Sequence, residues 1–471
     1  MKTLALLAFL LLLDSLVYGK DPWAIYSRSD IEAREADLAF RKAKTEKTSI
    51  IVYDKHQMSK EEVAEEIDRI VSKCEELGCP CDVKNLGKIG VLEVTWNCDP
   101  HPDVNDLGLD DTKETGAEDQ LVNAYTNSPP PTDPRFSDLW ALQDLSNNAD
   151  INIAEGWAEY LSDAQGGSAT GPSVVVAVID TGIDYTHPDL KDVMWTNPDE
   201  IAGDGIDNDG NGVVDDVYGA DYTGSSPSGD PIDRHSHGTH CSGTIAATAN
   251  NGEGVAGVAS FHQGKVKLMA LKGLSDSGGG TISGLLACLN YAVDKGAKIS
   301  SNSWGGGTVN GIEDVWDAVL RNNLDHLFVA AAGNSNREIT DSYKSMTCGL
   351  KEPNLLCVAS STRNDARSSF SNYGKDYVHV FAPGSDILSS IPNGRYAEYS
   401  GTSMACPHVS GLAALIMTMR DNMSAHEVRQ LIEANVRVKA EYASFVSSSG
   451  LIDAGATIKA LKGGSGNDTS K

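Results

Sequence analysis

Four polar side chains stand where an α/β protein places its reacting groups. Asp180 directly follows the apolar run 174–179, and Asn334 follows a second apolar run that ends at Gly333. Ser403 and His237 each open a stretch with helical character. Because functional groups of a parallel sheet gather outside the carboxyl ends of its strands, we expect these four side chains to meet at one edge.

Their residue types suit the hydrolysis of a peptide bond. A serine hydroxyl is a poor nucleophile alone, so Ser403 needs a base such as His237 to take its proton. A buried carboxylate such as Asp180 fixes the tautomer of that histidine and stabilises its charged form. The Asn334 amide and the backbone N–H of Ser403 can donate to the oxyanion, and losing a donor of this kind costs about 3–4 kcal/mol of transition-state stabilisation.

The segments around these residues resemble the four motifs of the subtilisin-like serine proteases. The motifs are VIDTGID at 178–184, HGTH at 237–240, AGN at 332–334 and GTSMA at 401–405. They occur in the order Asp, His, Ser, and the similarity runs from about Asp133 to Thr457. The resemblance implies a monomeric serine endopeptidase that forms an acyl-enzyme on protein or peptide substrates and needs no organic cofactor.

The pattern of elements predicts an α/β fold with a mostly parallel central sheet and helices on both faces. Continuous apolar runs, typical of strands buried on both faces, alternate with helical stretches. The expected strands are Val174–Ile179, Val266–Leu271, Ile299–Asn302 and His326–Ala331. The expected helices are Thr239–Ala249, Ser283–Asp294, Ile312–Asn322 and Ser403–Arg420.

The beginning of the chain predicts secretion. A basic start, an apolar run over 4–13 and small residues before Lys20 are typical of a signal peptide over 1–19, which is too short to be a membrane anchor. A net charge of −28 and a pI near 4.7 exclude a basic nucleic-acid-binding surface. We therefore expect a secreted, extracellular protein with no nucleic-acid partner.

Composition divides the rest of the chain. Residues 20–98 predict a small α+β module, with strands at Ser49–Tyr53 and Gly90–Trp96 and a capped helix running from Ser59 to about Glu76. Residues 99–132 form an acidic, proline-rich linker that suits proteolytic processing, residues 133–462 are the catalytic domain, and residues 463–471 are a flexible tail. The resemblance implies that the module is a propeptide that inhibits its own enzyme.

Two groups of oxygen-bearing residues predict structural calcium. The loop after residue 206 places carboxylates and amides at alternating positions with glycines between them, which suits Ca²⁺. Its expected ligands are Asp207, Asp209, Asn211, the Val213 carbonyl and Asp216, with Glu200 as a further candidate. The family resemblance alone implies a second site at Asp189, Asn251 and Asp133.

The family resemblance also locates the substrate-binding walls. Ser303, Trp304 and Gly305 would form one wall, and Ala331 and Gly333 the other. An extended peptide would pair with these edges by strand addition. Because the walls are small and apolar and carry no acidic cluster, we expect apolar or medium-sized side chains to be preferred, although the pocket floor is not identifiable from the sequence.

Nine cysteines in a secreted chain permit disulfides and leave at least one thiol over. Cys348 and Cys357 bracket a short loop and are the expected pair. Cys241 and Cys406 fall inside or beside the motifs, with their pairing open. Asn422 and Asn467 begin possible N-glycosylation sequons.

Two other functions fit parts of the sequence. His235, His237 and His240, with Cys241, offer the ligand types of a zinc hydrolase, but that function would leave Ser403 and Asn334 without a role. A catalytically inactive relative that only binds is the second alternative, and the intact triad counts against it. His187, His240 and His408 are interpreted as structural hydrogen-bonding residues.

Overall fold

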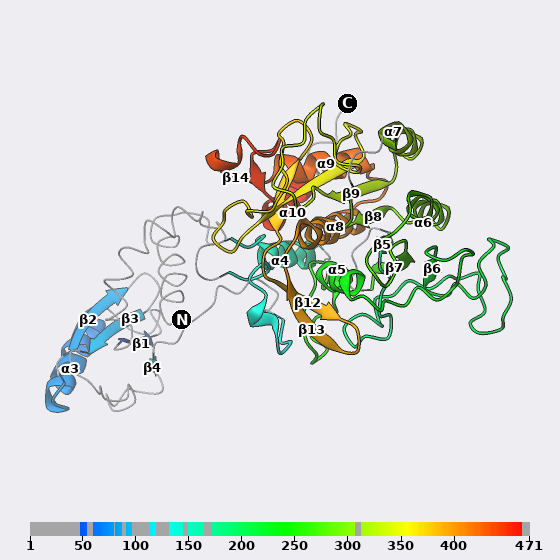
Figure 1. Ribbon diagram of the computed structural model, residues 1–471. Helices are drawn as coiled ribbons and strands as arrows, with labels where there is room; N and C mark the ends of the chain where they lie inside the picture. The colour runs from blue at the N-terminus through cyan, green and yellow to red at the C-terminus, as the bar shows by residue number, and fades with distance from the viewer. Residues whose placement is uncertain are drawn as a thin grey trace, which may run out of the picture. The chain divides into compact units, whose positions relative to one another are not determined.

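The computed structural model describes residues 48–53, 60–79, 81–86, 91–96, 114–118, 131–144, 149–163, 172–262, 264–306 and 312–463. The expected signal peptide over 1–19 and Asn467 lie outside these residues. The chain divides into two compact units, residues 1–125 and 126–471. Each is considered separately (Figure 1).

The first unit is a small α+β module. It contains β1 Thr48–Tyr53, α3 Lys60–Glu76, β2 Cys81–Leu86, β3 Val91–Trp96 and β4 Glu114–Glu118. The sheet has the order β2-β3-β1-β4 with antiparallel pairing throughout. A disulfide between Cys74 and Cys81 ties the end of α3 to β2.

The sequence did not anticipate β4, which lies inside the segment 99–132 that we expected to be a linker. This strand pairs with β1 through the backbone, so the pairing needs no apolar run. The boundary between the two units accordingly falls at residue 125, whereas composition placed the end of the module at 98.

The second unit is built on a nine-stranded sheet, which confirms the predicted α/β class. The strand order is β14-β15-β11-β10-β9-β8-β5-β7-β6, and the pairs from β15 to β6 are parallel, while β14 pairs with β15 antiparallel. The strands are β5 Val174–Asp180, β6 Gly219–Asp221, β7 Val266–Lys272, β8 Ile299–Asn302, β9 Leu327–Ala331, β10 Leu355–Ser361, β11 Val380–Pro383, β14 Arg437–Val438 and β15 Gly450–Leu451. A separate hairpin joins β12 Ile387–Ile391 to β13 Arg395–Tyr399.

Helices cover both faces of this sheet. They are α4 Ile153–Asp163, α5 His237–Ala246, α6 Ile282–Asp294, α7 Ile312–Asn322, α8 Thr402–Met419, α9 Ala425–Ala434 and α10 Ala454–Gly463. α5 and α8 pack against each other, and α8 contacts β5 and β8 to β11. α6 contacts β5 and β7, and α6 and α7 lie across the sheet from α8 (Figure 1).

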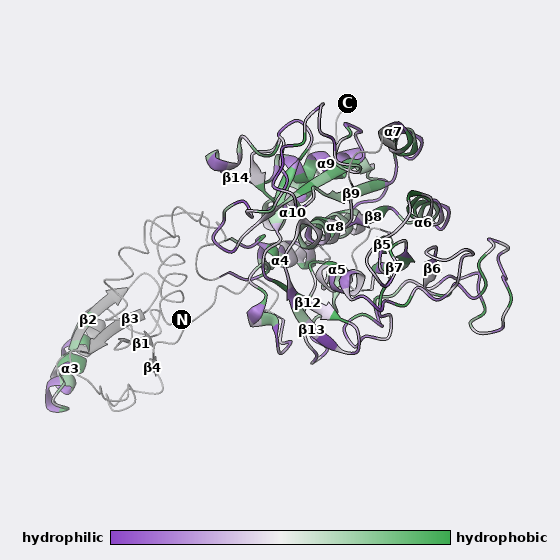
Figure 2. Ribbon diagram, in the orientation of Figure 1, coloured by the Kyte–Doolittle hydropathy of each residue, from purple (hydrophilic) through white to green (hydrophobic). Residues whose placement is uncertain are grey.

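The core lies along the central strands and α8. Hydrophobic residues gather in these strands, and hydrophilic ones along the peripheral loops (Figure 2). Among the described helices, α8 alone is long and apolar enough to cross a membrane, but 94% of its apolar window is buried inside the unit. α8 is therefore the core helix that carries Ser403 at its N-terminal end.

Candidate active site

Asp180 and the partly exposed His237 form a hydrogen-bonded pair at the edge of the sheet. Asp180 is the last residue of β5 and is fully buried, while His237 begins α5. His237 Nδ1 lies 2.7 Å from Asp180 Oδ1, which also accepts the Thr181 backbone N–H at 2.7 Å. With Nδ1 held by the carboxylate, the ring can use only Nε2 to exchange a proton with a reacting group.

The charge of Asp180 controls the protonation of His237. Burial disfavours the charged imidazolium, but the Asp180 carboxylate beside the ring outweighs burial and raises the pKa of His237 well above its ordinary value. His237 therefore becomes a neutral base only as the pH rises through this elevated pKa.

Asp233, which the sequence analysis missed, holds the start of α5 in place. Ser236, the residue before the helix, makes no side-chain cap and has a φ of 97°. The Asp233 carboxylate instead accepts hydrogen bonds from the backbone N–H of Ser236 and Thr239 and from the Thr181 hydroxyl. One buried side chain thus joins the turn after Asp180 to the helix that carries His237.

Ser403 lies in the first turn of α8. Its hydroxyl donates to the Ser303 carbonyl at 2.9 Å, and the Ser303 hydroxyl donates in return to the Ser403 carbonyl at 2.9 Å. Although both side chains belong to the described part of the chain, no hydrogen bond joins Ser403 to His237 in this conformation. Such bonds are often formed only once substrate is bound.

Cys241 lies between the two. Its sulfur is 3.4 Å from the Ser403 carbonyl oxygen and 4.0 Å from His237 Nδ1. The contacts place the start of α8 against α5, so Ser403 and His237 share a neighbour. Cys241 is a buried free thiol, and burial raises its pKa.

The Asn334 side chain is oriented by Thr402. Its Oδ1 accepts the Thr402 backbone N–H at 2.9 Å and the Thr402 hydroxyl at 3.0 Å, which leaves Nδ2 as the outward donor. A Cβ placed on Gly401 would lie 3.3 Å from Asn334 Nδ2 and 3.6 Å from the Ser403 backbone nitrogen. Both predicted oxyanion donors therefore lie next to the Gly401 Cα, and a side chain at position 401 would contact them.

Two hollows meet at His235, next to His237. One is lined by Ser303–Gly306 on one side and Ser277–Gly280 on the other. The second is lined by Asp233–Ser236 and by residues 391–395 with Tyr399. The predicted wall of Ser303, Trp304 and Gly305 lines the first hollow, whereas Ala331 and Gly333 do not line it; the sequence analysis did not identify the segment Ser277–Gly280.

The loop predicted to hold calcium brings three carboxylates together. Ligand oxygens of Glu200, Asp207 and Asp209 lie within 4.8 Å of one another. Glu200 Oε2 is buried and has no hydrogen-bond partner, as expected of an oxygen that binds a cation. The Asp216 carboxylate does not join this group, because it accepts hydrogen bonds from Tyr291 and Asn197.

The second predicted calcium group also converges. Asn251 Nδ2 lies 2.8 Å from Asp189 Oδ1, and the Asn251 backbone N–H donates to Asp133 at 3.2 Å. Asp189 and Asp133 are both buried. The structure thus joins all three residues around one loop, with Asn250 donating a further backbone N–H to Asp133.

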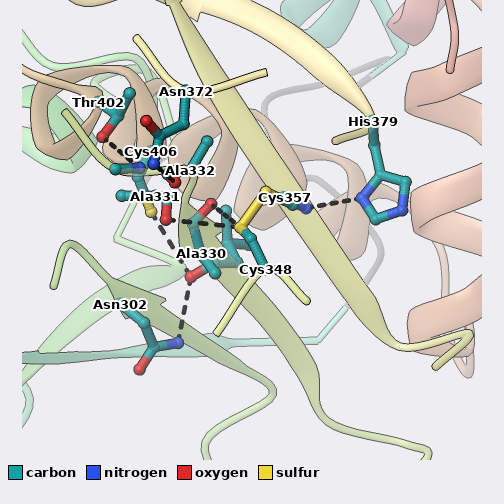
Figure 3. The surroundings of a disulfide bond; sticks show 12 residues. Asn302, Ala330, Ala331, Ala332, Cys348, Cys357, Asn372, His379, Thr402 and Cys406 are labelled. Atoms are coloured by element: carbon teal, nitrogen blue, oxygen red, sulfur yellow. Dashed lines mark hydrogen bonds between the residues drawn. A yellow bond between two sulfur atoms is a disulfide. The ribbon is translucent and has the colours of Figure 1, made fainter. Parts of the chain in front are cut away.

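A disulfide joins Cys348, which precedes β10 in the chain, to Cys357, which lies on β10 (Figure 3). Cys241, Cys288 and Cys406 are free and buried among the described residues. Asn422 is exposed in the turn after α8.

The histidines do not assemble into the zinc site of the alternative hypothesis. His240 is fully buried, and its Nε2 lies 2.9 Å from the Ile387 carbonyl, while burial lowers its pKa to about 4. The group of metal-ligand types at this point is Asp180, His237 and Cys241, not the three histidines. His187 Nε2 and His408 Nδ1 likewise face backbone carbonyls.

Comparisons with known proteins identify the family of this chain. Residues 171–452, more than half of the chain, match the family model described as Peptidase S8, subtilase family. The chain is 36% identical over 268 residues to thermitase of Thermoactinomyces vulgaris, covering 56% of this chain and 81% of thermitase. It is 32% identical over 301 residues to subtilisin-like protease 1 of Plasmodium berghei, covering 59% of this chain but 48% of that relative, so it spans about half the length of such relatives.

A solved structure shares the fold. It is a protease from Pseudoalteromonas arctica, with a TM-score of 0.53 and 28% sequence identity, and the match covers 71% of this chain and 100% of that one.

Proposed function

Because this chain belongs to the subtilase family, we propose that it is a secreted serine endopeptidase in which Ser403, His237 and Asp180 form the catalytic triad. The observation that carries the proposal is the hydrogen-bonded His237–Asp180 pair, which shares the neighbour Cys241 with Ser403 in the first turn of α8. All three residues of the proposed triad have the side chains that the reaction needs, which argues against the inactive-relative alternative.

The proposed reaction begins from the hydrogen bond that holds the Ser403 hydroxyl. The Ser403 hydroxyl leaves the Ser303 carbonyl, gives its proton to His237 Nε2 and attacks the scissile carbonyl carbon. Asn334 Nδ2 and the Ser403 N–H donate to the resulting oxyanion, and His237 returns the proton to the departing amine. Water, activated by the same histidine, then hydrolyses the acyl-enzyme.

A serine-directed phosphonylating reagent tests this assignment. We expect the secreted protein to take up one label, on the peptide containing Ser403, and to lose peptide-cleaving activity in proportion. Sensitivity to chelators without labelling of Ser403 would instead support a metal-dependent hydrolase.

The N-terminal unit is proposed to be a propeptide that inhibits the enzyme until the segment 99–132 is cut. Its support is its position and, in its described residues, a four-stranded sheet accompanied by the helix α3. N-terminal sequencing of the labelled protein tests this proposal, since a mature chain that still starts at Lys20 would rule out a zymogen.

Calcium is proposed to stabilise two loops of the catalytic unit. Glu200, Asp207 and Asp209 would hold one ion, with Asn211, Val213 and Asp216 around it, and Asp189, Asn251 and Asp133 would hold the other. The ion would add positive charge to these carboxylates, of which Asp209 already pairs with Lys295.

Removal of calcium by a chelator is expected to lower the melting temperature of the mature enzyme by about 5–8 °C. Differential scanning calorimetry with and without added Ca²⁺ measures the shift. The Glu200→Gln, Asp207→Asn double variant should lose part of the response to calcium. An unchanged melting temperature in the chelated wild type would refute the proposal.

A further inference from the structure

Lys272 is a buried lysine beside the candidate active site. It ends β7 and lies opposite Asp180 in the parallel register of β5 and β7. The residue is 2% exposed, and a lysine is almost never buried to this extent unless its charge is paired. The groups that its ammonium binds therefore indicate its role.

The ammonium group binds the turn that follows Asp180. Lys272 Nζ donates to the Thr181 carbonyl oxygen at 2.6 Å. The preceding carbonyl is held by the same strand end, because the backbone N–H groups of Gly273 and Leu274 both donate to the Asp180 carbonyl oxygen at 3.0 Å. Since the Thr181 N–H in turn donates to the Asp180 carboxylate, a shift of this turn would displace that carboxylate.

The ammonium group also binds the loop that lines the substrate hollow. Lys272 Nζ donates to Asp276 Oδ1 at 2.7 Å, and the Asp276 side chain is 51% exposed. Asp276 does not line the hollow, but the next four residues, 277–280, do. The Ser275 backbone N–H donates to the Gly279 carbonyl oxygen at 2.8 Å and closes the loop, so fixing Asp276 fixes the residues that line the hollow.

Stability alone does not account for this arrangement. Removing an ammonium group from water is costly, and a buried ion pair is often no more stabilising than apolar side chains of similar volume. Two hydrogen bonds from the end of one strand do, however, fix their two acceptors relative to each other. The acceptors here are the turn that carries the triad carboxylate and the loop beside the substrate hollow.

We propose that Lys272 is a positioning residue that fixes the Asp180 turn and the loop 275–280 relative to each other. The inference rests on the endopeptidase function proposed above. Through Thr181, the lysine keeps the Asp180 carboxylate in the place from which it orients the catalytic histidine. Through Asp276, it keeps the loop where an extended peptide can pair with it. Lys272 does not line the hollow, so it acts only through these partners.

Two substrates separate the two contacts on the mature enzyme. One is a peptide long enough to pair with the loop 275–280, and the other is an activated ester of a single blocked amino acid, which leaves the loop empty. Lys272→Met removes the charge and the donors, and it should lower kcat on both substrates by about tenfold because the displaced carboxylate orients the histidine poorly. Asp276→Ala should raise KM for the peptide by about threefold, leave KM for the ester unchanged, and keep kcat on both within about twofold of the wild type.

Lys267→Met is the matched control. Lys267 lies on the same strand, but its Nζ donates to the Asp192 carbonyl oxygen at 2.8 Å, so its kinetic constants should equal those of the wild type. Titration with the phosphonylating reagent gives the active fraction of each variant. A substitution that only destabilised the fold would lower this fraction and leave kcat per active site unchanged.

A wild-type kcat per active site in Lys272→Met, or an unchanged peptide KM in Asp276→Ala, would overturn the inference alone. Because the Asp276 side chain is half exposed, its variant decides the inference if Lys272→Met does not fold. Absence of Ser403-dependent cleavage by the wild type would overturn the proposed function as well.

Discussion

Replacing Ser403 by alanine is expected to lower kcat for peptide hydrolysis by about 10⁶-fold, the magnitude known for the nucleophile of subtilisin itself. The hydroxyl is the only group at the start of α8 that the proposed reaction makes covalent. Its removal leaves Asn334 and the helix N-terminus in place, because Thr402 and not Ser403 holds the Asn334 amide. A residual acceleration from the oxyanion donors should therefore remain.

The measurement is single-turnover and steady-state cleavage of a peptide by the mature protein. Ser410→Ala is the matched control, because Ser410 is a buried serine on the same helix, bonded to the Cys406 carbonyl away from His237. Its kcat should stay within about tenfold of the wild type. Unchanged cleavage by Ser403→Ala would show that another group is the nucleophile, whereas a wild type that cleaves no peptide would favour the inactive-relative hypothesis.

Asp180→Asn is expected to lower kcat by about 10⁴-fold and to move the pH dependence of the remaining activity. In the wild type, kcat/KM should rise with pH as His237 loses its proton, and the Asp180 carboxylate places that rise well above the ordinary range of histidine. Asparagine removes the charge but leaves the burial, which lowers the pKa. The acidic limb should therefore shift to lower pH while the plateau falls.

The pH profile of kcat/KM checks both effects together. Asp184→Asn is the control, because Asp184 is a buried carboxylate of the same motif that accepts its hydrogen bonds from Thr186 and Asn393. Its acidic limb should stay where the wild type has it. An Asp180→Asn profile that keeps the wild-type limb would show that another group controls the rise.

The central strands were predictable because their sequences carry the signal. β5, β7 and β9 are largely apolar runs, and these three strands and β8 each begin and end within a residue of their predicted positions. β6, β14 and β15 have two or three residues, too few to show a period, and are defined by their neighbours. The same holds for β4, which sequence composition assigned to a linker.

The residues of the candidate site likewise include some that the sequence predicts and some that it does not. Asp180, His237, Asn334 and Ser403 were found because motifs mark strand ends and helix starts. Asp233 and Thr402 were missed because their importance lies in tertiary hydrogen bonds, which leave no periodic trace. The rotamer of Ser403 depends on packing between distant segments, and no local pattern specifies it.

The parallel order of the sheet has a consequence for when the proposed protease activity can arise during synthesis. Asp180 emerges from the ribosome early, but α8, which carries Ser403 and packs on six strands of the sheet, is translated near the end of the domain. Pairings so distant in sequence form slowly and late during folding. A nascent or truncated chain should therefore lack the proposed activity, because the candidate active site is completed only after almost the whole domain has been synthesised.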